Sequence, residues 1–150
     1  MSDKKSKTEG WLKASGTSES GFSTTDVSAI RYLSDQGYAF EGVSSKEERL
    51  AFFLRTLEII EGRSYPIEPF GGSGTAIALF IDDKNYFYNG ESGKINIEKF
   101  DKELEKVKIF ADFSLSTGSA EKKIVAHGEF AGIVESNKKV LDEEGAFIVK

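Results

Sequence analysis

The alternation of apolar and polar residues in the second half of the chain constrains the fold more than any other feature. Between Lys106 and Leu115 every second residue is apolar, and the residues that alternate with these are polar except for Phe110. This period of two is typical of a half-buried strand. The same pattern recurs over Ile124–Phe130 and, more briefly, over Ile95–Ile97. With turn residues between these segments, we predict three consecutive antiparallel strands that form a meander.

Further strands are predicted before this meander. Thr75–Ile81 is apolar on both faces, which is typical of a central strand, and Tyr86–Tyr88 is expected to run back beside it until Asn89–Gly90 reverses the chain. The two prolines confine Tyr65–Pro69 to an edge or a connection, because proline donates no ladder hydrogen bond. The other predicted strands are Trp11–Ala14, Thr25–Leu33 and Tyr38–Val43, and Ala146–Val149 is either a last strand or a frayed tail.

Two templates fit the segment Ser45–Ile60. Ser45 and Glu48 have the spacing of a helix-capping box, and the apolar residues that follow have helical spacing. Leu50–Leu54 also alternates as a strand does, and the neighbouring segments are rich in strand formers. We favour the strand and keep a short helix as the alternative.

Together these segments predict an all-β fold. Eight or nine short strands separated by regular turn signals indicate an antiparallel β-sandwich or a closed β-barrel, between which the pattern does not choose. A length of 150 residues is typical of one domain. We therefore expect a single β domain over residues 1–150, with a flexible N-terminal tail of about residues 1–9.

Composition excludes several kinds of chemistry. The chain has no Cys and one His, so thiolate metal sites, disulfides and sites of several histidines are excluded. The net charge of −5 and the interspersed charges argue against nucleic-acid binding. No apolar stretch is long enough for a membrane helix, and no secretory signal pattern follows the first lysines. We therefore expect a cytoplasmic protein and keep signal-independent export as the alternative.

Familiar catalytic motifs are incomplete in this sequence. Gly90–Lys94 resembles the end of a phosphate-binding loop, but Ile95 stands where that motif needs a hydroxyl. Gly71–Thr75 imitates a nucleophile elbow without its last glycine. We therefore predict no catalytic residue, no metal site and no cofactor, and we expect a protein that is not an enzyme.

Five residues are predicted to belong to a binding surface. Tyr86 and Tyr88 are expected on one face of a short strand, and Trp11 offers a further amphipathic ring. His127 and Glu129 are two residues apart on one strand and are expected to point outward together. The alternative for the tyrosines is packing at the rim of the core, and for His127 and Glu129 it is an ordinary solvated sheet face.

Several segments together resemble an uncharacterised bacterial family of small all-β, lipoprotein-like proteins. In that family a Gly-x-Tyr segment precedes a Gly-x-hydrophobic-x-hydrophobic strand, an x-Phe-Ser strand and a closing Gly-x-Phe. The resemblance covers about the last two-thirds of the chain and implies a β fold without an activity. This chain lacks the cysteine that carries the lipid in such relatives. The segments that carry the resemblance are Glu61–Ile67, Tyr86–Tyr88, Gly93–Ile97, Phe100–Asp101, Ala111–Ser114 and Gly128–Phe130.

Three functions remain open at the level of the sequence. The first is a non-enzymatic module that binds a protein partner, for example an acidic immunity-type protein that neutralises a basic toxin. The second is a lipocalin-like barrel that carries a small apolar ligand among its phenylalanines. The third is a hydrolase that uses a pair of carboxylates.

Overall fold

The computed structural model of the chain describes residues 8–17, 21–69, 74–117 and 120–139. Within these residues the fold is all-β, as predicted, and no helix is found. No segment of this part of the chain forms a helix that could cross a membrane. The strands are β1 (Glu9–Ser15), β2 (Phe22–Thr24), β3 (Val27–Tyr32), β4 (Gly37–Val43), β5 (Arg49–Leu54), β6 (Ser64–Pro66), β7 (Ala76–Ile81), β8 (Phe87–Asp101), β9 (Lys106–Thr117), β10 (Ala120–Ala131) and β11 (Val134–Ser136).

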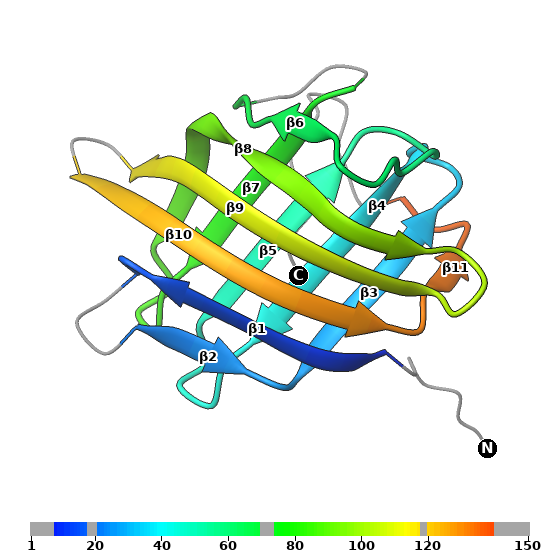
Figure 1. Cartoon of the computed structure of the whole chain (residues 1–150). Coiled ribbons are helices and arrows are strands. Elements are labelled where there is room, and N and C mark those ends of the chain that lie inside the picture. Colours follow the sequence, from blue (N-terminus) through cyan, green and yellow to red (C-terminus); the bar gives the residue numbers. More distant parts are fainter. Residues whose placement is uncertain (1–7, 18–20, 70–73, 118–119, 140–150) are drawn as a thin grey trace.

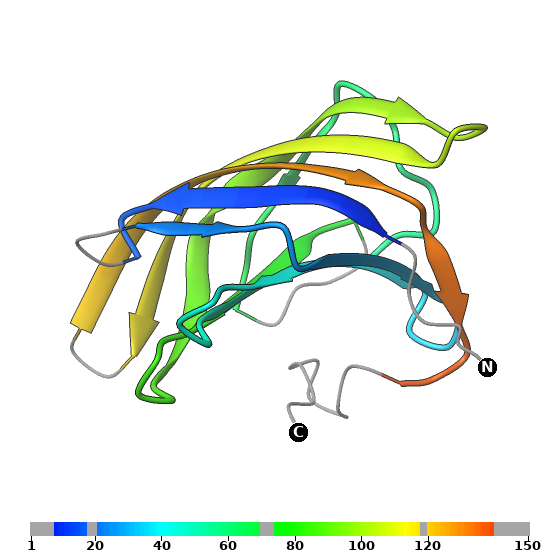
Figure 2. The same ribbon diagram turned by 90° about the horizontal axis from the view of Figure 1, so that it is seen from below.

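All of these strands belong to one strongly curled sheet. Its order is β11-β3-β4-β5-β7-β8-β9-β10-β1-β2, and β6 pairs with β8 beside this path. The sheet is mixed, because β11 runs parallel to β3 whereas the other ladders are antiparallel. Figure 1 shows β8, β9, β10 and β1 crossing over β7, β5, β4 and β3. Figure 2 shows these two parts of the sheet as layers that face each other and together form an open half-barrel.

The prediction of a closed barrel or a sandwich is therefore wrong, and the sheet has more strands than the predicted eight or nine. The predicted antiparallel pairing is confirmed for the ladders other than that of β11 with β3. Closure requires a ladder between the first and last strands of the sheet, and in the described residues β2 and β11 do not pair. Single hydrogen bonds bridge the opening instead. Thr24 Oγ1 donates to the Val43 carbonyl at 2.6 Å, and Thr8 Oγ1 accepts from the Ala29 amide at 3.1 Å.

The strand β8 is longer than the sequence pattern indicated. The expected reversal at Asn89–Gly90 is wrong, since the strand continues through these residues and bends at a bulge between Gly90 and Ser92. Gly93 has φ 120°, and an added Cβ would lie 2.4 Å from the Phe113 Cα. The bulge and this glycine let one strand pair first with β7 and later with β6, which bends the sheet.

The segment from Ser45 onward forms a turn and a strand, so the alternative of a short helix is wrong. Ser44 Oγ accepts hydrogen bonds from the amides of Lys46 and Glu48, both at 3.2 Å. These bonds satisfy backbone amides as a helix cap does, but here they close the hairpin between β4 and β5. The favoured reading as a strand is confirmed for Arg49–Leu54.

The inner face of the curled sheet is filled by large apolar side chains. The Phe40 and Phe130 rings lie 5.2 Å apart, and the Phe52 and Phe113 rings lie 5.3 Å apart, so each pair joins the two layers. Burying each such side chain stabilises the fold by about 1.5–3 kcal/mol. The strand β7 is buried along its whole length, as its apolar sequence predicts.

The ends of the chain lie largely outside the described residues. The predicted tail of residues 1–9 extends too far, because Glu9 already pairs with Ala131 and Thr8 donates to the Gly132 carbonyl. The predicted segment Ala146–Val149 also lies outside the described residues.

Candidate functional site

The side of β8, β9, β10 and β1 that points away from the interior carries a mixture of aromatic and charged side chains. Alternation places Leu12 and Ala126 inside, whereas the residues before and after each of them on the same strand are exposed or half-buried. We call this surface the outer face. It comprises Trp11, Lys13, Lys94, Asn96, Lys108, Phe110, Asp112, Val125, His127 and Glu129.

A single cross-strand row forms the middle of the outer face. Phe110 and His127 are direct partners in the ladder, and their rings lie 4.9 Å apart with 58° between the planes. The Ser64 hydroxyl donates to the Asn96 side chain at one end of the row. Strand pairing places Ser23, Lys13, His127, Phe110, Asn96 and Ser64 side by side across β2, β1, β10, β9, β8 and β6.

Trp11 and its neighbours form the adjacent row. The Lys13 ammonium lies 5.4 Å from the centre of the Trp11 ring, which is a cation–π contact. Trp11 is paired with Glu129, whose Oε2 lies 4.0 Å from Lys108 Nζ. Both charged side chains are about half exposed, so water and salt screen this ion pair.

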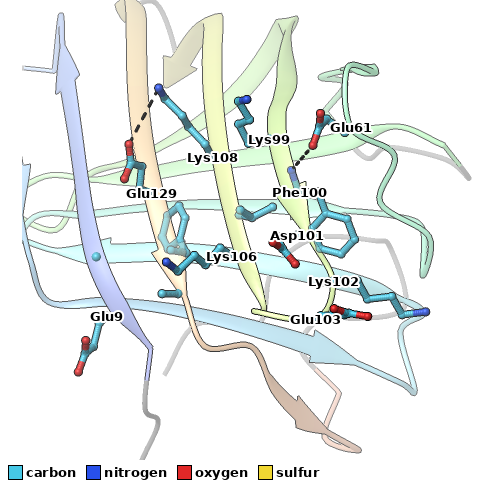
Figure 3. Close-up of a pocket in the computed structure, with 14 residues that line it drawn as sticks. Glu9, Glu61, Lys99, Phe100, Asp101, Lys102, Glu103, Lys106, Lys108 and Glu129 are labelled. Atoms are coloured by element: carbon cyan, nitrogen blue, oxygen red, sulfur yellow. Dashed lines mark hydrogen bonds and ion pairs between the residues drawn. The ribbon is translucent and has the colours of Figure 1, made fainter.

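A shallow groove of about 820 Å³ borders this row. Its floor is the inward-pointing row of Gly10, Phe130, Val107 and Phe100, which belongs to β1, β10, β9 and β8. Figure 3 shows Glu129, Lys108 and Lys99 on one side of the groove and Lys106, Asp101 and Glu103 on the other. The walls comprise the carboxylates Glu9, Glu61, Asp101, Glu103 and Glu129 and the lysines Lys99, Lys102, Lys106 and Lys108.

The structure brings together three of the five residues that the sequence singled out. Trp11, His127 and Glu129 share the outer face, and the prediction that His127 and Glu129 both point outward is confirmed. The nearest charged partner of Glu129 is Lys108 rather than the imidazole. His127 is therefore exposed on the outer face, and its described contact is with the Phe110 ring.

The two tyrosines do not share an exposed face, so this part of the prediction is wrong. The strand begins at Phe87, and Tyr88 points into the core, where its ring lies 6.1 Å from the Phe80 ring. Tyr86 is exposed and precedes the strand, and its amide donates to Asp82 Oδ1. Core packing therefore accounts for Tyr88, whereas Tyr86 lies in the turn between β7 and β8.

Phe110 and Val125 belong to the outer face but were not among the predicted site residues. Each is apolar at a position where the strand pattern requires a polar residue. That break in the alternation was the signal that could have identified them. An apolar residue on the exposed side of a strand leaves apolar surface in water, and contact with another molecule can bury that surface.

The described residues contain no cluster of carboxylates or histidine that could hold a metal ion. Burial raises the pKa of Tyr32, where Glu41 adds to the rise, and burial also raises the pKa of Tyr38, where Arg31 opposes it. Both tyrosines belong to β3 and β4, on the opposite layer from the outer face. The arrangement on the outer face suits contact with another molecule more than proton transfer.

Comparisons with protein-family models, with curated proteins and with solved structures found no match. The resemblance to the bacterial family of small β proteins therefore stays a prediction.

Proposed function

We propose that this chain is a non-enzymatic module that binds a protein partner through its outer face. The observation that carries the proposal is the row in which His127 contacts Phe110, flanked by Trp11 and Val125 and surrounded by charged side chains. Protein interfaces combine aromatic residues near the centre with a polar rim in this way. Tryptophan is among the residues that contribute most to such interfaces.

The charges of the outer face indicate the chemistry of the partner. Lys13, Lys94 and Lys108 stand beside Asp112 and Glu129, so the face carries both signs. A partner with an apolar patch and a rim of mixed charge complements this surface. A basic toxin, as an immunity-type protein would bind, is attracted by the net charge of −5 but finds no excess of carboxylates on this face.

The packed interior favours this proposal over a carrier of apolar ligands. The rings of Phe22 and Phe80 lie 6.3 Å apart, and the pairs Phe40–Phe130 and Phe52–Phe113 are closer. A lipocalin-like carrier needs that interior space for its ligand. For a carboxylate-dependent hydrolase, the groove supplies acidic side chains, but they alternate with lysines and are open to water.

Site-specific photo-cross-linking in cells tests the proposal. The photoreactive residue p-benzoylphenylalanine replaces Phe110 in one variant and Lys13 in another. Matched control variants carry it at Ile60, which is 44% exposed outside the outer face, and at Tyr86. We expect the same discrete protein adduct from positions 110 and 13, no adduct from position 60, and loss of the adduct when Trp11→Ala is added.

Other outcomes contradict the proposal. Adducts of equal yield from positions 110 and 60 would mean that contacts are random over the surface. An adduct only from position 86 would move the interaction to the turn between β7 and β8. Reproducible absence of any adduct from positions 13 and 110 would leave the outer face without a partner.

A further inference from the structure

The strand β8 has a second bulge, and this one lies at the groove. Its pairing with β9 shifts by one residue between Ile97 and Lys99. If the ladder continued without a shift from the pair of Ile97 and Ile109, Glu98 would stand opposite Lys108. The shift places Lys99 opposite Lys108 instead. The bulge therefore replaces a pair of opposite charges by a pair of like charges.

A third lysine adds to this concentration of positive charge. Lys106 precedes Lys108 by two residues on β9, so both side chains leave the strand on the same side. We call Lys99, Lys106 and Lys108 the lysine triad. All three line the groove, and Lys99 and Lys106 are exposed. Among the described residues, the ion pair of the triad is that of Lys108 with Glu129 at 4.0 Å.

Two carboxylates of the groove are engaged by the backbone rather than by the triad. Glu61 Oε1 accepts a hydrogen bond from the Phe100 amide at 2.9 Å. Asp101 Oδ1 accepts one from the Leu104 amide at 3.0 Å. These oxygens hold the end of β8 and the turn that follows it, so their role is structural.

Two other carboxylates lie farther from the opposed lysines. Figure 3 shows Glu9 and Glu103 toward one end of the groove, whereas Lys99 and Lys108 lie toward the other end. The part of the groove that contains Lys99 and Lys108 therefore has an excess of positive charge.

The bulge has a structural reason that does not require a lysine at position 99. The shift pairs Phe100 with Val107 and lets Phe100 pack against the core. Any polar residue at position 99 would permit this packing. Like charges directly opposite each other in a ladder are unfavourable, although water and salt screen them. A negatively charged ligand would offset this repulsion, so the choice of lysine favours a site for such a ligand.

We propose that the lysine triad binds an acidic segment of the protein partner, whose Asp or Glu carboxylates pair with the lysines beside the half-buried Phe100 ring. The three positions are separated by roughly 5 Å across the ladder and roughly 7 Å along β9, which suits several singly charged carboxylates better than one phosphoryl group. This inference rests on the proposed function, because it names the chemistry of the partner at the groove.

Charge-reversal variants of the full chain test the proposal against the partner recovered by cross-linking. Lys99→Glu with Lys106→Glu reverses two charges of the triad. Lys84→Glu with Lys138→Glu makes the same change of net charge at exposed positions outside the groove and the outer face. We expect the triad variant to raise Kd at least tenfold and the control to raise it less than twofold. Equal effects would overturn the proposal, since only net charge would then matter.

Mapping of the cross-linked segment tests its chemistry. p-Benzoylphenylalanine at Lys102, which lines the groove outside the triad, should give an adduct with a partner peptide that contains at least two Asp or Glu residues. A peptide without acidic residues, or one that carries a phosphoryl group, would refute the proposal. So would an adduct from position 110 with none from position 102, although that result would support the proposed function.

A probe peptide tests the groove without the partner. The acetylated and amidated peptide Glu-Phe-Glu-Phe-Glu is titrated into the isotopically labelled full chain, with Lys-Phe-Lys-Phe-Lys as the control peptide. We expect saturable changes of the amide NMR signals of Lys99, Lys106 and Lys108 with the acidic peptide alone, and their loss in Lys99→Glu with Lys106→Glu. No saturable change, or equal changes with both peptides, would overturn this inference and leave the proposed function to the cross-linking experiment.

The stability of the free chain tests the repulsion between the opposed lysines. Lys99→Gln removes one of these charges, and Lys84→Gln removes an exposed charge elsewhere. We expect Lys99→Gln alone to raise the urea midpoint at low salt. The difference should vanish in about 1 M NaCl, where the screening length falls to about 3 Å. A midpoint of Lys99→Gln equal to that of the parent at low salt would contradict the repulsion and, with it, the proposal.

Discussion

At the scale of single residues, position in the strand decides the role of an aromatic side chain more than its type does. Phe113 obeys the alternation and packs against Phe52, whereas Phe110 breaks it and lies against His127 outside. The sequence alone therefore separates these two phenylalanines. The burial of Tyr88 could not be predicted in this way. Its strand starts at Phe87, and that start depends on the turn in which Asp82 accepts the Tyr86 amide.

The buried tyrosines predict how stability responds to alkaline pH. Burial raises the pKa of Tyr32 and Tyr38 above the ordinary value of 10.0, so the folded protein holds these protons more tightly than the unfolded chain. Their contribution to stability is complete below that value and is lost as the pH rises above it. Urea unfolding at a series of pH values should show a decline above pH 10.0 that is shallower in Tyr32→Phe with Tyr38→Phe.

Tyr86→Phe is the matched control, because it removes an exposed phenol. An equal decline in the parent and in the double variant would show that the buried tyrosines do not cause the loss of stability at alkaline pH.

At the scale of elements, the sequence predicted strands well and their connections less well. The meander of β8, β9 and β10, the doubly buried β7 and the edge position of β6 follow from periodicity and proline. Gly90 and Gly93 have the character of turn residues, but ladder pairing with β9 continues through both of them, and at this point the strand only bulges, between Gly90 and Ser92. The predicted capping box was Ser45 with Glu48, but Ser44 is the residue that accepts the Glu48 amide, and it does so in a hairpin turn.

The approach of β1 to β4 depends on two glycines that enclose Leu12. A Cβ added to Gly42 would lie 2.8 Å from Thr24 Cγ2 and 3.1 Å from Leu12 Cδ2, and a Cβ added to Gly128 would lie 2.9 Å from Leu12 Cδ1. We expect Gly42→Val to lower the free energy of unfolding by about 1–3 kcal/mol, measured by urea denaturation.

Ser15→Val is the control for this prediction, since it adds a branched side chain to an exposed position of β1. If both variants unfold at the same urea concentration as the parent, the two layers are not as closely packed as we describe.

At the scale of the whole molecule, the curl of the sheet lies beyond what strand patterns contain. Alternation fixes which side of each strand is buried, but closure depends on bulges and on whether the first and last strands meet. Here β2 is short and leads into β3, and in the described residues hydrogen bonds such as that of Thr24 Oγ1 to the Val43 carbonyl bridge the opening. The outer face follows from the strand order, because the pairing of β1 with β10 and of β10 with β9 joins residues that are distant in sequence, such as Trp11 and Phe110.

The affinity for the partner recovered by cross-linking measures the role of the outer face most directly. Calorimetric titration of the parent, Trp11→Ala and Ile60→Ala against that partner compares the two surfaces. We predict that Trp11→Ala weakens binding by about 2 kcal/mol, or roughly thirtyfold in Kd, while Ile60→Ala leaves it unchanged. Equal affinity of Trp11→Ala and the parent would contradict the claim that this protein binds through its outer face.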